Sequence, residues 1–165
     1  MKDQSNLYGT TGKDIFLKTK KGKNGHLLDN QVENDITFIS KNMTISLLND
    51  LYNISDCYVS PYRAEAFNLC PLEAAATGTP IIVTEGGSTD DYFKKDFGLQ
   101  IKSEFINSNN RKYLDPNLES LVENISLIIQ NPGKYGNENS IKFIRDNFSW
   151  KKIVEKTYNV FKRKI

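Results

Sequence analysis

Two carboxylates stand eight residues apart on either side of an expected helix start. Glu65 follows the β-rich run Cys57–Ser60 in a stretch expected to be a strand-to-helix loop, and Glu73 falls one turn into the next helix. Both should face the crevice beyond the carboxyl ends of parallel strands, where open α/β sheets bind ligands. Carboxylates accept hydrogen bonds from sugar and ribose hydroxyls, and free N–H groups at a helix start attract phosphate. The arrangement therefore indicates a nucleotide-sugar site.

Strands and helices are expected to alternate around these carboxylates. Short apolar or β-branched runs predict strands at Ile15–Lys18, Asp35–Ile39, Cys57–Ser60, Ile81–Thr84 and Gly98–Ile101. Thr44 is a candidate N-cap for a helix that carries Ile45, Leu48 and Tyr52 at helical spacing. This alternation predicts an α/β fold with a doubly wound parallel sheet.

Punctuating residues set the expected helix boundaries. Pro71 fits a first helical turn, where its missing N–H costs nothing, and Gly78 fits the position just past a helix end. From Pro116 onward the pattern turns helical. The first helix of this part carries one apolar stripe, made of Leu118, Leu121, Val122, Ile125, Ile128 and Ile129. Two further helices are expected to follow it, with a break between them near Phe148 and Ser149.

The segment with the carboxylates resembles the E-x7-E signature of retaining glycosyltransferase family 4, and the resemblance covers roughly residues 35 to 160. The run Asp56–Pro61 resembles the family's strand before the signature. Downstream, Gly78–Thr84 and Gly86–Asp90 resemble its next strand and double-glycine loop, and Asn147–Trp150 resembles the motif before its last helix. Five pieces in the family's order make the resemblance specific.

The resemblance implies the Rossmann-like, C-terminal half of a GT-B fold, which binds a UDP- or GDP-sugar for retaining transfer of a hexosyl group to an acceptor hydroxyl. Glu65 would be the active-site carboxylate that orients the donor sugar, and Glu73 would clamp the ribose. No metal is expected, because amides and the helix dipole would neutralise the diphosphate. The other expected donor contacts are Tyr62, Arg63, Phe67, Asn68, Leu69, Gly86 and Gly87.

This chain departs from the family's pattern at two positions. Ala66 and Asn68 stand where the family usually has glycine, and no counterpart to the Arg of its diphosphate-binding basic pair can be found. A non-catalytic nucleotide-binding or interaction module that kept the fold is therefore the main alternative, with an epimerase-like domain as a further one. A receiver-type signalling domain needs an Asp at a strand end, where this chain has Ser60 and Pro61.

Two local alternatives need no ligand. Glu73, near the third helical position, could cap its own helix and complement the helix dipole. Gly86 and Gly87 could form a plain turn.

Composition bounds the remaining possibilities. The chain has 165 residues, of which 38% are hydrophobic and 25% charged, as in a single globular domain. A formal net charge of +2 gives no field that would favour nucleic acid. Two cysteines are too few for a disulfide framework, which fits a cytoplasmic protein. No apolar run reaches the roughly 18 residues that suggest a membrane-spanning helix.

Residues 1–165 are thus expected to form one donor-binding domain, with a mobile, lysine-rich loop at residues 19–34. His26, the only histidine, lies in this loop and is expected to have no part in the chemistry. The acceptor-binding domain that precedes the donor domain in the GT-B arrangement is expected to be absent. An acceptor glycan, lipid or protein would then be held by that missing domain, and this domain alone would be inactive or weak.

Overall fold

The computed structural model describes residues 36–37, 39, 42–108 and 111–162. The chain divides into two compact units, Met1–Thr44 and Ile45–Ile165. The predicted strand Ile15–Lys18 and the predicted loop at residues 19–34 lie outside the described residues. So does part of the predicted strand Asp35–Ile39, of which Ile39 is a single bridge residue. All the helices and strands described below belong to the second unit.

A three-stranded parallel sheet forms the centre of this unit. Its strands are β1 (Tyr58–Ser60), β2 (Ile81–Thr84) and β3 (Gly98–Ile101), in the order β1-β2-β3. Tyr58 pairs with Ile81, and Ile81 in turn pairs with Gly98. The central strand β2 is buried on both faces, as its continuous β-branched sequence predicts. The predicted α/β parallel sheet is confirmed.

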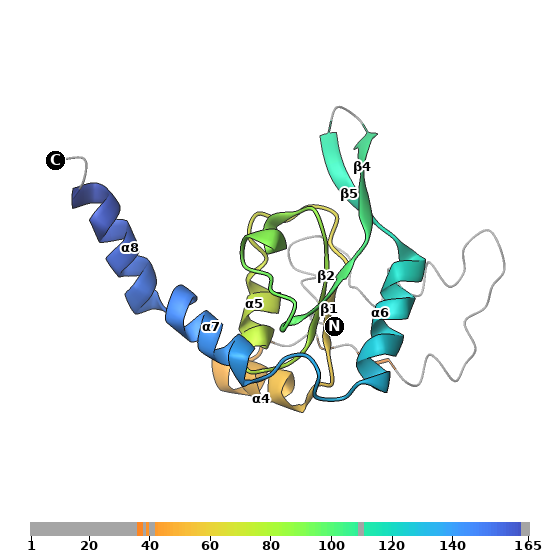
Figure 1. Ribbon diagram of the computed structural model, residues 1–165, viewed down its shortest axis with the longest axis horizontal. Coiled ribbons are helices and arrows are strands. Elements are labelled where there is room, and N and C mark those ends of the chain that lie inside the picture. The colour runs from red at the N-terminus through yellow and green to blue at the C-terminus, as the bar shows by residue number, and fades with distance from the viewer. Residues whose placement is uncertain (1–35, 38, 40–41, 109–110, 163–165) are drawn as a thin grey trace. The chain divides into compact units, whose positions relative to one another are not determined.

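Helices cover both faces of the sheet (Figure 1). On one side, α5 (Leu69–Ala76) lies against β1 and β2, and Ile81 and Val83 of β2 join its core cluster. On the other side, α6 (Leu118–Gln130) contacts Ile82, which belongs to a second cluster with Ile101 and Ile128. Successive side chains of β2 thus pack into the cores on opposite faces of the sheet, because strand side chains alternate between the two faces.

The inner face of α6 differs from the predicted apolar stripe. Of that stripe, Ile128 is buried and Leu121 packs beside it, whereas Leu118 and Ile129 are about 70% exposed. Two buried polar residues instead satisfy the free edge of β3: Asn124 donates to the Gln100 carbonyl (2.9 Å), and the Ser120 hydroxyl accepts from the Lys102 amide (3.1 Å). Hydrogen bonding to a helix thereby covers an exposed strand edge.

The remaining helices follow the predicted boundaries. α4 (Ile45–Ile54) begins directly after Thr44, and Leu48 and Tyr52 pack on the core while Ile45 is exposed. α7 (Glu138–Phe148) and α8 (Trp150–Lys162) are split at Ser149.

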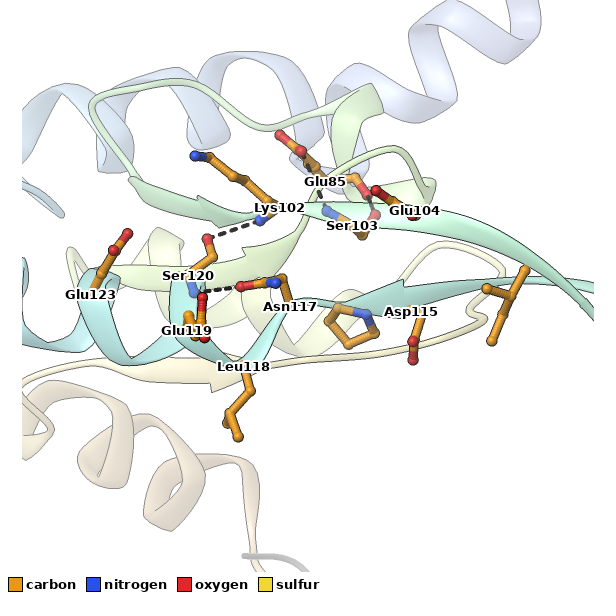
Figure 2. Close-up of a pocket in the computed structure, with 12 residues that line it drawn as sticks. Glu85, Lys102, Ser103, Glu104, Asp115, Asn117, Leu118, Glu119, Ser120 and Glu123 are labelled. Atoms are coloured by element: carbon orange, nitrogen blue, oxygen red, sulfur yellow. Dashed lines mark hydrogen bonds between the residues drawn. The ribbon is translucent and has the colours of Figure 1, made fainter.

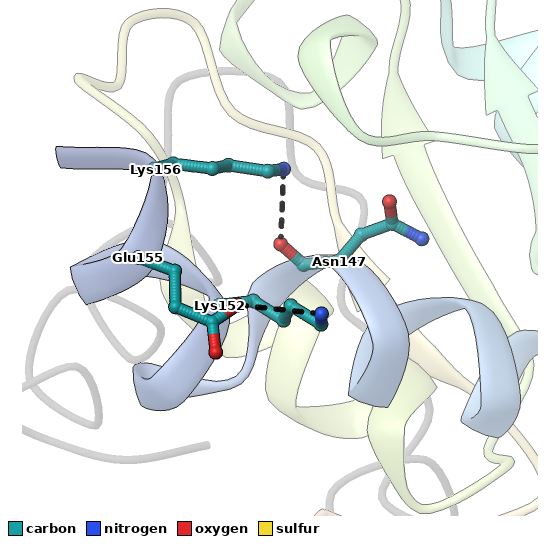
Figure 3. A network of polar contacts seen from close by, with 4 residues as sticks. All are labelled: Asn147, Lys152, Glu155 and Lys156. Carbon is teal, nitrogen blue, oxygen red and sulfur yellow. Dashed lines mark hydrogen bonds and ion pairs between the residues drawn. The ribbon is translucent and has the colours of Figure 1, made fainter. Parts of the chain in front are cut away.

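The end of α7 is linked to α8 by the Lys156 ammonium, which donates to the Asn147 carbonyl (3.4 Å; Figure 3). None of the described residues of α8 is buried. Among the described residues, every helix is too short or too polar to cross a membrane.

A β-hairpin after β3 has no counterpart in the sequence prediction. β4 (Ser103–Ser108) and β5 (Arg111–Pro116) pair antiparallel, with Ser103 opposite Pro116 and Ser108 opposite Arg111. Most of its residues are exposed, so its sequence lacks a strong alternation of apolar and polar residues. The hairpin begins two residues beyond the end of β3 and therefore rises from the carboxyl edge of the sheet (Figure 1).

Candidate functional site

The loop between β1 and α5 is anchored by the buried ring of Tyr62. Its hydroxyl donates to the Thr84 carbonyl (3.1 Å) and accepts from the Thr89 amide (3.2 Å), and it lies 2.8 Å from the Thr89 hydroxyl. The loop after β1 is therefore fixed to the end of β2 and to the short 3₁₀ helix η1 (Ser88–Asp91). Tyr62 was expected to contact the donor, but here its hydroxyl is occupied within the protein.

Phe67 and Asn68 shape the last part of this loop. The Phe67 ring packs on Tyr92 with centroids 5.4 Å apart, and the Tyr92 hydroxyl donates to the Asn68 carbonyl (2.8 Å). Asn68 has φ 61°, in the left-handed region, and its side-chain amide donates to the Ser60 hydroxyl (3.0 Å). Asn is among the few non-glycine residues that tolerate this conformation. Asn68 can therefore adopt the backbone shape that a glycine would supply there.

The start of α5 keeps free hydrogen-bonding capacity. Asn68 is the N-cap residue, yet its side chain makes no capping hydrogen bond to the first turn. Leu69 is largely exposed and Cys70 is exposed, while Pro71 has no N–H to satisfy. The amides of the first turn lie at the positive end of the helix dipole. This end of α5 is suited to an anion.

Glu73 is the fifth residue of α5, so it does not cap its own helix. Its Oε2 accepts a hydrogen bond from the Tyr52 hydroxyl of α4 (3.2 Å), while the Glu73 side chain stays exposed. Burial raises the pKa of Tyr52 well above its usual value, and the nearby Cys70 and Glu73 raise it further. The Tyr52 hydroxyl therefore stays protonated and remains a donor to Glu73 at any physiological pH.

Glu65 and Glu73 both act on a third group, Tyr58 at the start of β1. The pKa of Tyr58 is raised, first by burial, then by Cys70, and then by the negative charges of Glu73 and Glu65. Glu65 lies exposed in the loop after β1, and Glu73 lies on the first half of α5. Both carboxylates therefore lie near enough to Tyr58 to raise its pKa, as does Cys70, the second residue of α5.

The double glycine after β2 serves packing in this structure. Gly86 has φ 81°, and its amide donates to the Asp90 carboxylate (2.9 Å), so this N–H is already used. A Cβ on Gly87 would lie 2.6 Å from the Tyr62 hydroxyl and 2.9 Å from Leu114. Glycine is therefore required at position 87 because Tyr62 and Leu114 approach its backbone closely.

Arg63 points to the hairpin. Its guanidinium pairs with Asp115 (2.9 Å) and lies 5.8 Å from the centre of the Tyr113 ring. The Arg63 carbonyl also accepts from the Leu114 amide (2.8 Å). This partnership joins residues 52 positions apart, and the hairpin residues carry no sequence pattern that predicts it.

A groove of about 920 Å³ lies at the base of the hairpin, beside the first turn of α6 (Figure 2). Lys102 is the one cation among its described lining residues, beside five carboxylates. These are Glu85, Glu104, Asp115, Glu119 and Glu123. This charge would repel a diphosphate, so the groove is unsuited to the phosphate end of a nucleotide. Among the described residues, no cluster of three or more His, Cys, Asp or Glu side chains could hold a metal ion.

Comparison with known proteins identifies the family. The sequence profile of the family "Glycosyl transferases group 1" matches residues 18–145. The chain therefore belongs to the group 1 glycosyltransferases. It is 42% identical over 53 residues to a lipopolysaccharide core biosynthesis mannosyltransferase of Rhizobium meliloti. It is also 27% identical over 118 residues to an uncharacterized glycosyltransferase of Methanocaldococcus jannaschii.

These relatives are much longer than the chain. The two matches cover 32% and 70% of this chain but only 14% and 27% of the respective relatives. The second match spans most of the unit described above, so the similarity is not confined to the segment with the two carboxylates.

The packing around Gly87 can be tested by substitution. We expect Gly87→Ala to lower the free energy of unfolding by about 1–3 kcal/mol, because the added methyl group meets a hydrogen-bonded ring that cannot withdraw. Chemical denaturation measures the loss. The double variant Tyr62→Phe/Gly87→Ala removes the nearest atom and should lose less than the sum of the single variants. An unchanged unfolding midpoint in Gly87→Ala would show that this close approach does not constrain the fold.

Proposed function

We propose that the chain is the donor-binding half of a retaining, family 4 glycosyltransferase of the GT-B fold, and that it binds a UDP- or GDP-sugar. One observation carries the proposal: the start of α5, where the N-cap side chain makes no capping hydrogen bond, stands in the chain between Glu65 in the preceding loop and Glu73 on the helix. Such a site offers an anion cradle beside two hydrogen-bond acceptors for hydroxyl groups. Membership of the group 1 glycosyltransferases supports this use of the site.

The diphosphate would bind at the start of α5. Amides of Phe67, Asn68 and Leu69 would donate to it, and the helix dipole would favour its charge. As the glycosidic bond to the donor breaks, negative charge grows on the leaving diphosphate. Fixed amides stabilise such a charge without reorganising, so we propose that no divalent metal is needed.

The two carboxylates would have separate roles. Glu73 Oε2 is held by Tyr52, which leaves Oε1 to accept a hydrogen bond from a ribose hydroxyl. Glu65 lies on the loop and would bind hydroxyls of the donor sugar, holding its anomeric carbon in position for transfer. The hexosyl group would pass to an acceptor hydroxyl with retention of configuration, the leaving phosphate helping to remove the acceptor's proton.

The acceptor would be bound by another part of a longer protein. A glycan, a lipid or a protein could supply the hydroxyl group, and the mannosyltransferase relative makes mannose one candidate sugar. Because the donor and the acceptor would be held by different domains, the present chain should bind its donor but transfer the sugar only weakly.

Single substitutions of the two carboxylates separate their roles. We expect Glu73→Ala to weaken binding of free UDP or GDP by roughly 1–3 kcal/mol, the scale of lost charge-assisted hydrogen bonds. Glu65→Ala should leave that affinity nearly intact and abolish transfer in the longer enzyme. Calorimetry measures binding, with Glu123→Ala, at an exposed position of α6, as the matched control. If Glu73→Ala binds free UDP or GDP with full affinity, Glu73 does not bind the ribose. If Glu65→Ala loses affinity equally for the nucleotide and the nucleotide sugar, Glu65 does not act on the sugar.

Tyr52 should position Glu73. We expect Tyr52→Phe to weaken nucleotide binding by about 0.5–1.5 kcal/mol, because Glu73 loses a neutral donor that fixes its orientation. The same substitution in a Glu73→Ala background should have no further effect on binding, which a merely structural role of Tyr52 would not produce. Equal losses in both backgrounds would contradict the positioning role.

A further inference from the structure

The β4–β5 hairpin lies directly beside the loop that carries Glu65. The Leu114 amide donates to the Arg63 carbonyl (2.8 Å), and Asp115 pairs with the Arg63 guanidinium (2.9 Å). Arg63 is two residues before Glu65 in the same loop. The hairpin is therefore fixed to the edge of the candidate donor site by both backbone and side-chain contacts.

A pocket of about 740 Å³ lies between this loop and the outer half of the hairpin. Its described lining contains three cationic residues and no carboxylate, in contrast to the acidic groove at the hairpin base. The lining residues are Arg63, Ala64, Ser108, Arg111, Lys112 and Tyr113. The hairpin thus separates an anionic surface at its base from a cationic one nearer its tip.

Strand alternation sets the direction of these cations. Tyr113 and Asp115 of β5 both contact Arg63, so the side chain two residues earlier, Arg111, lies on the same face of the hairpin. Lys112 belongs to the opposite face, where its ammonium lies 3.9 Å from the centre of the Phe105 ring. Arg63 and the Arg111 side chain therefore lie on the same side of the hairpin, whereas Lys112 lies on the opposite side.

The geometry of Arg63 leaves donors for a ligand. The ion pair with Asp115 engages a single terminal nitrogen, Nη2, of a group with five N–H donors. The Tyr113 ring beside it restricts where the guanidinium can move. Two guanidinium groups in one pocket favour a tetrahedral, doubly charged oxyanion, which each can bind through two parallel hydrogen bonds.

We propose that this pocket binds a phosphoryl group of a substrate. The proposal rests on the transferase function above and adds a basic contact for which the sequence showed no counterpart. The phosphoryl group could come from the donor's diphosphate or from a phosphate-bearing acceptor. Both sources share the chemistry that Arg63 and Arg111 recognise, so the experiment must tell them apart.

The test measures binding of inorganic pyrophosphate and of UDP and GDP to the 165-residue chain by calorimetry at low salt. Arg111→Gln/Lys112→Gln removes two charges from the pocket. Lys142→Gln/Arg145→Gln removes the same two charge types from exposed positions on α7 and is the matched control. We expect pyrophosphate affinity to fall at least about tenfold in the pocket variant, as for lost charge-assisted hydrogen bonds, and to stay unchanged in the control. Thermal unfolding checks that both variants fold.

Further readings of the same experiment identify the source. If nucleotide affinity falls with that of pyrophosphate and the two compete, the pocket binds the donor's diphosphate. If nucleotide affinity is kept and pyrophosphate binds alongside, the pocket serves a phosphate-bearing acceptor. Equal pyrophosphate affinity in the pocket and control variants would overturn the proposal while leaving the donor function intact. If the chain binds no nucleotide but binds pyrophosphate in a way that depends on Arg111, the pocket proposal is supported and the proposed donor function is contradicted.

Discussion

The carboxyl edge of the sheet is organised around one buried hydroxyl group, that of Tyr62. It joins the loop after β1 to the end of β2 through Thr84, and to η1 through Thr89. A buried polar group is stable only when it is hydrogen-bonded, so this junction holds three segments in one arrangement. Gly87 permits the approach of the ring, and Leu114 of the hairpin closes over the same glycine. Glu65 lies three residues after Tyr62 in the same loop, so its position depends on this junction.

A row of aromatic rings continues the support from the loop into the helices. Phe67 packs on Tyr92, Tyr92 on Phe148, and Phe148 on Phe143. Phe148 closes α7, which contacts α5 along the same side of the sheet. Because Tyr92 also donates to the Asn68 carbonyl, the left-handed turn that opens α5 is held by the core. The start of α5 is thereby supported by residues up to about 80 positions further along the chain.

The sequence predicted the elements whose signals are local. The β-branched run of β2, the first-turn Pro71 and the break at Ser149 each describe their own surroundings, and all three predictions are confirmed. Contacts distant in sequence could not be predicted in this way. The hairpin, the pairing of Arg63 with Asp115 and the polar inner face of α6 depend on which edge of the sheet is left uncovered. The roles of Glu65 and Glu73 stay predictions.

Protection of Cys70 from alkylation would report directly whether a nucleotide sugar binds at the start of α5, because Cys70 is the second residue of α5 and is exposed. Burial, followed by the charge of Asp56, raises the pKa of the Cys57 thiol to about 12, which disfavours its reaction at pH 8. The rate of iodoacetamide labelling would be measured with a panel of UDP-, GDP- and ADP-sugars, with Cys70→Ser as the blank. We expect one nucleotide sugar to slow the labelling of Cys70 saturably. Labelling at an unchanged rate with every member of the panel would contradict it.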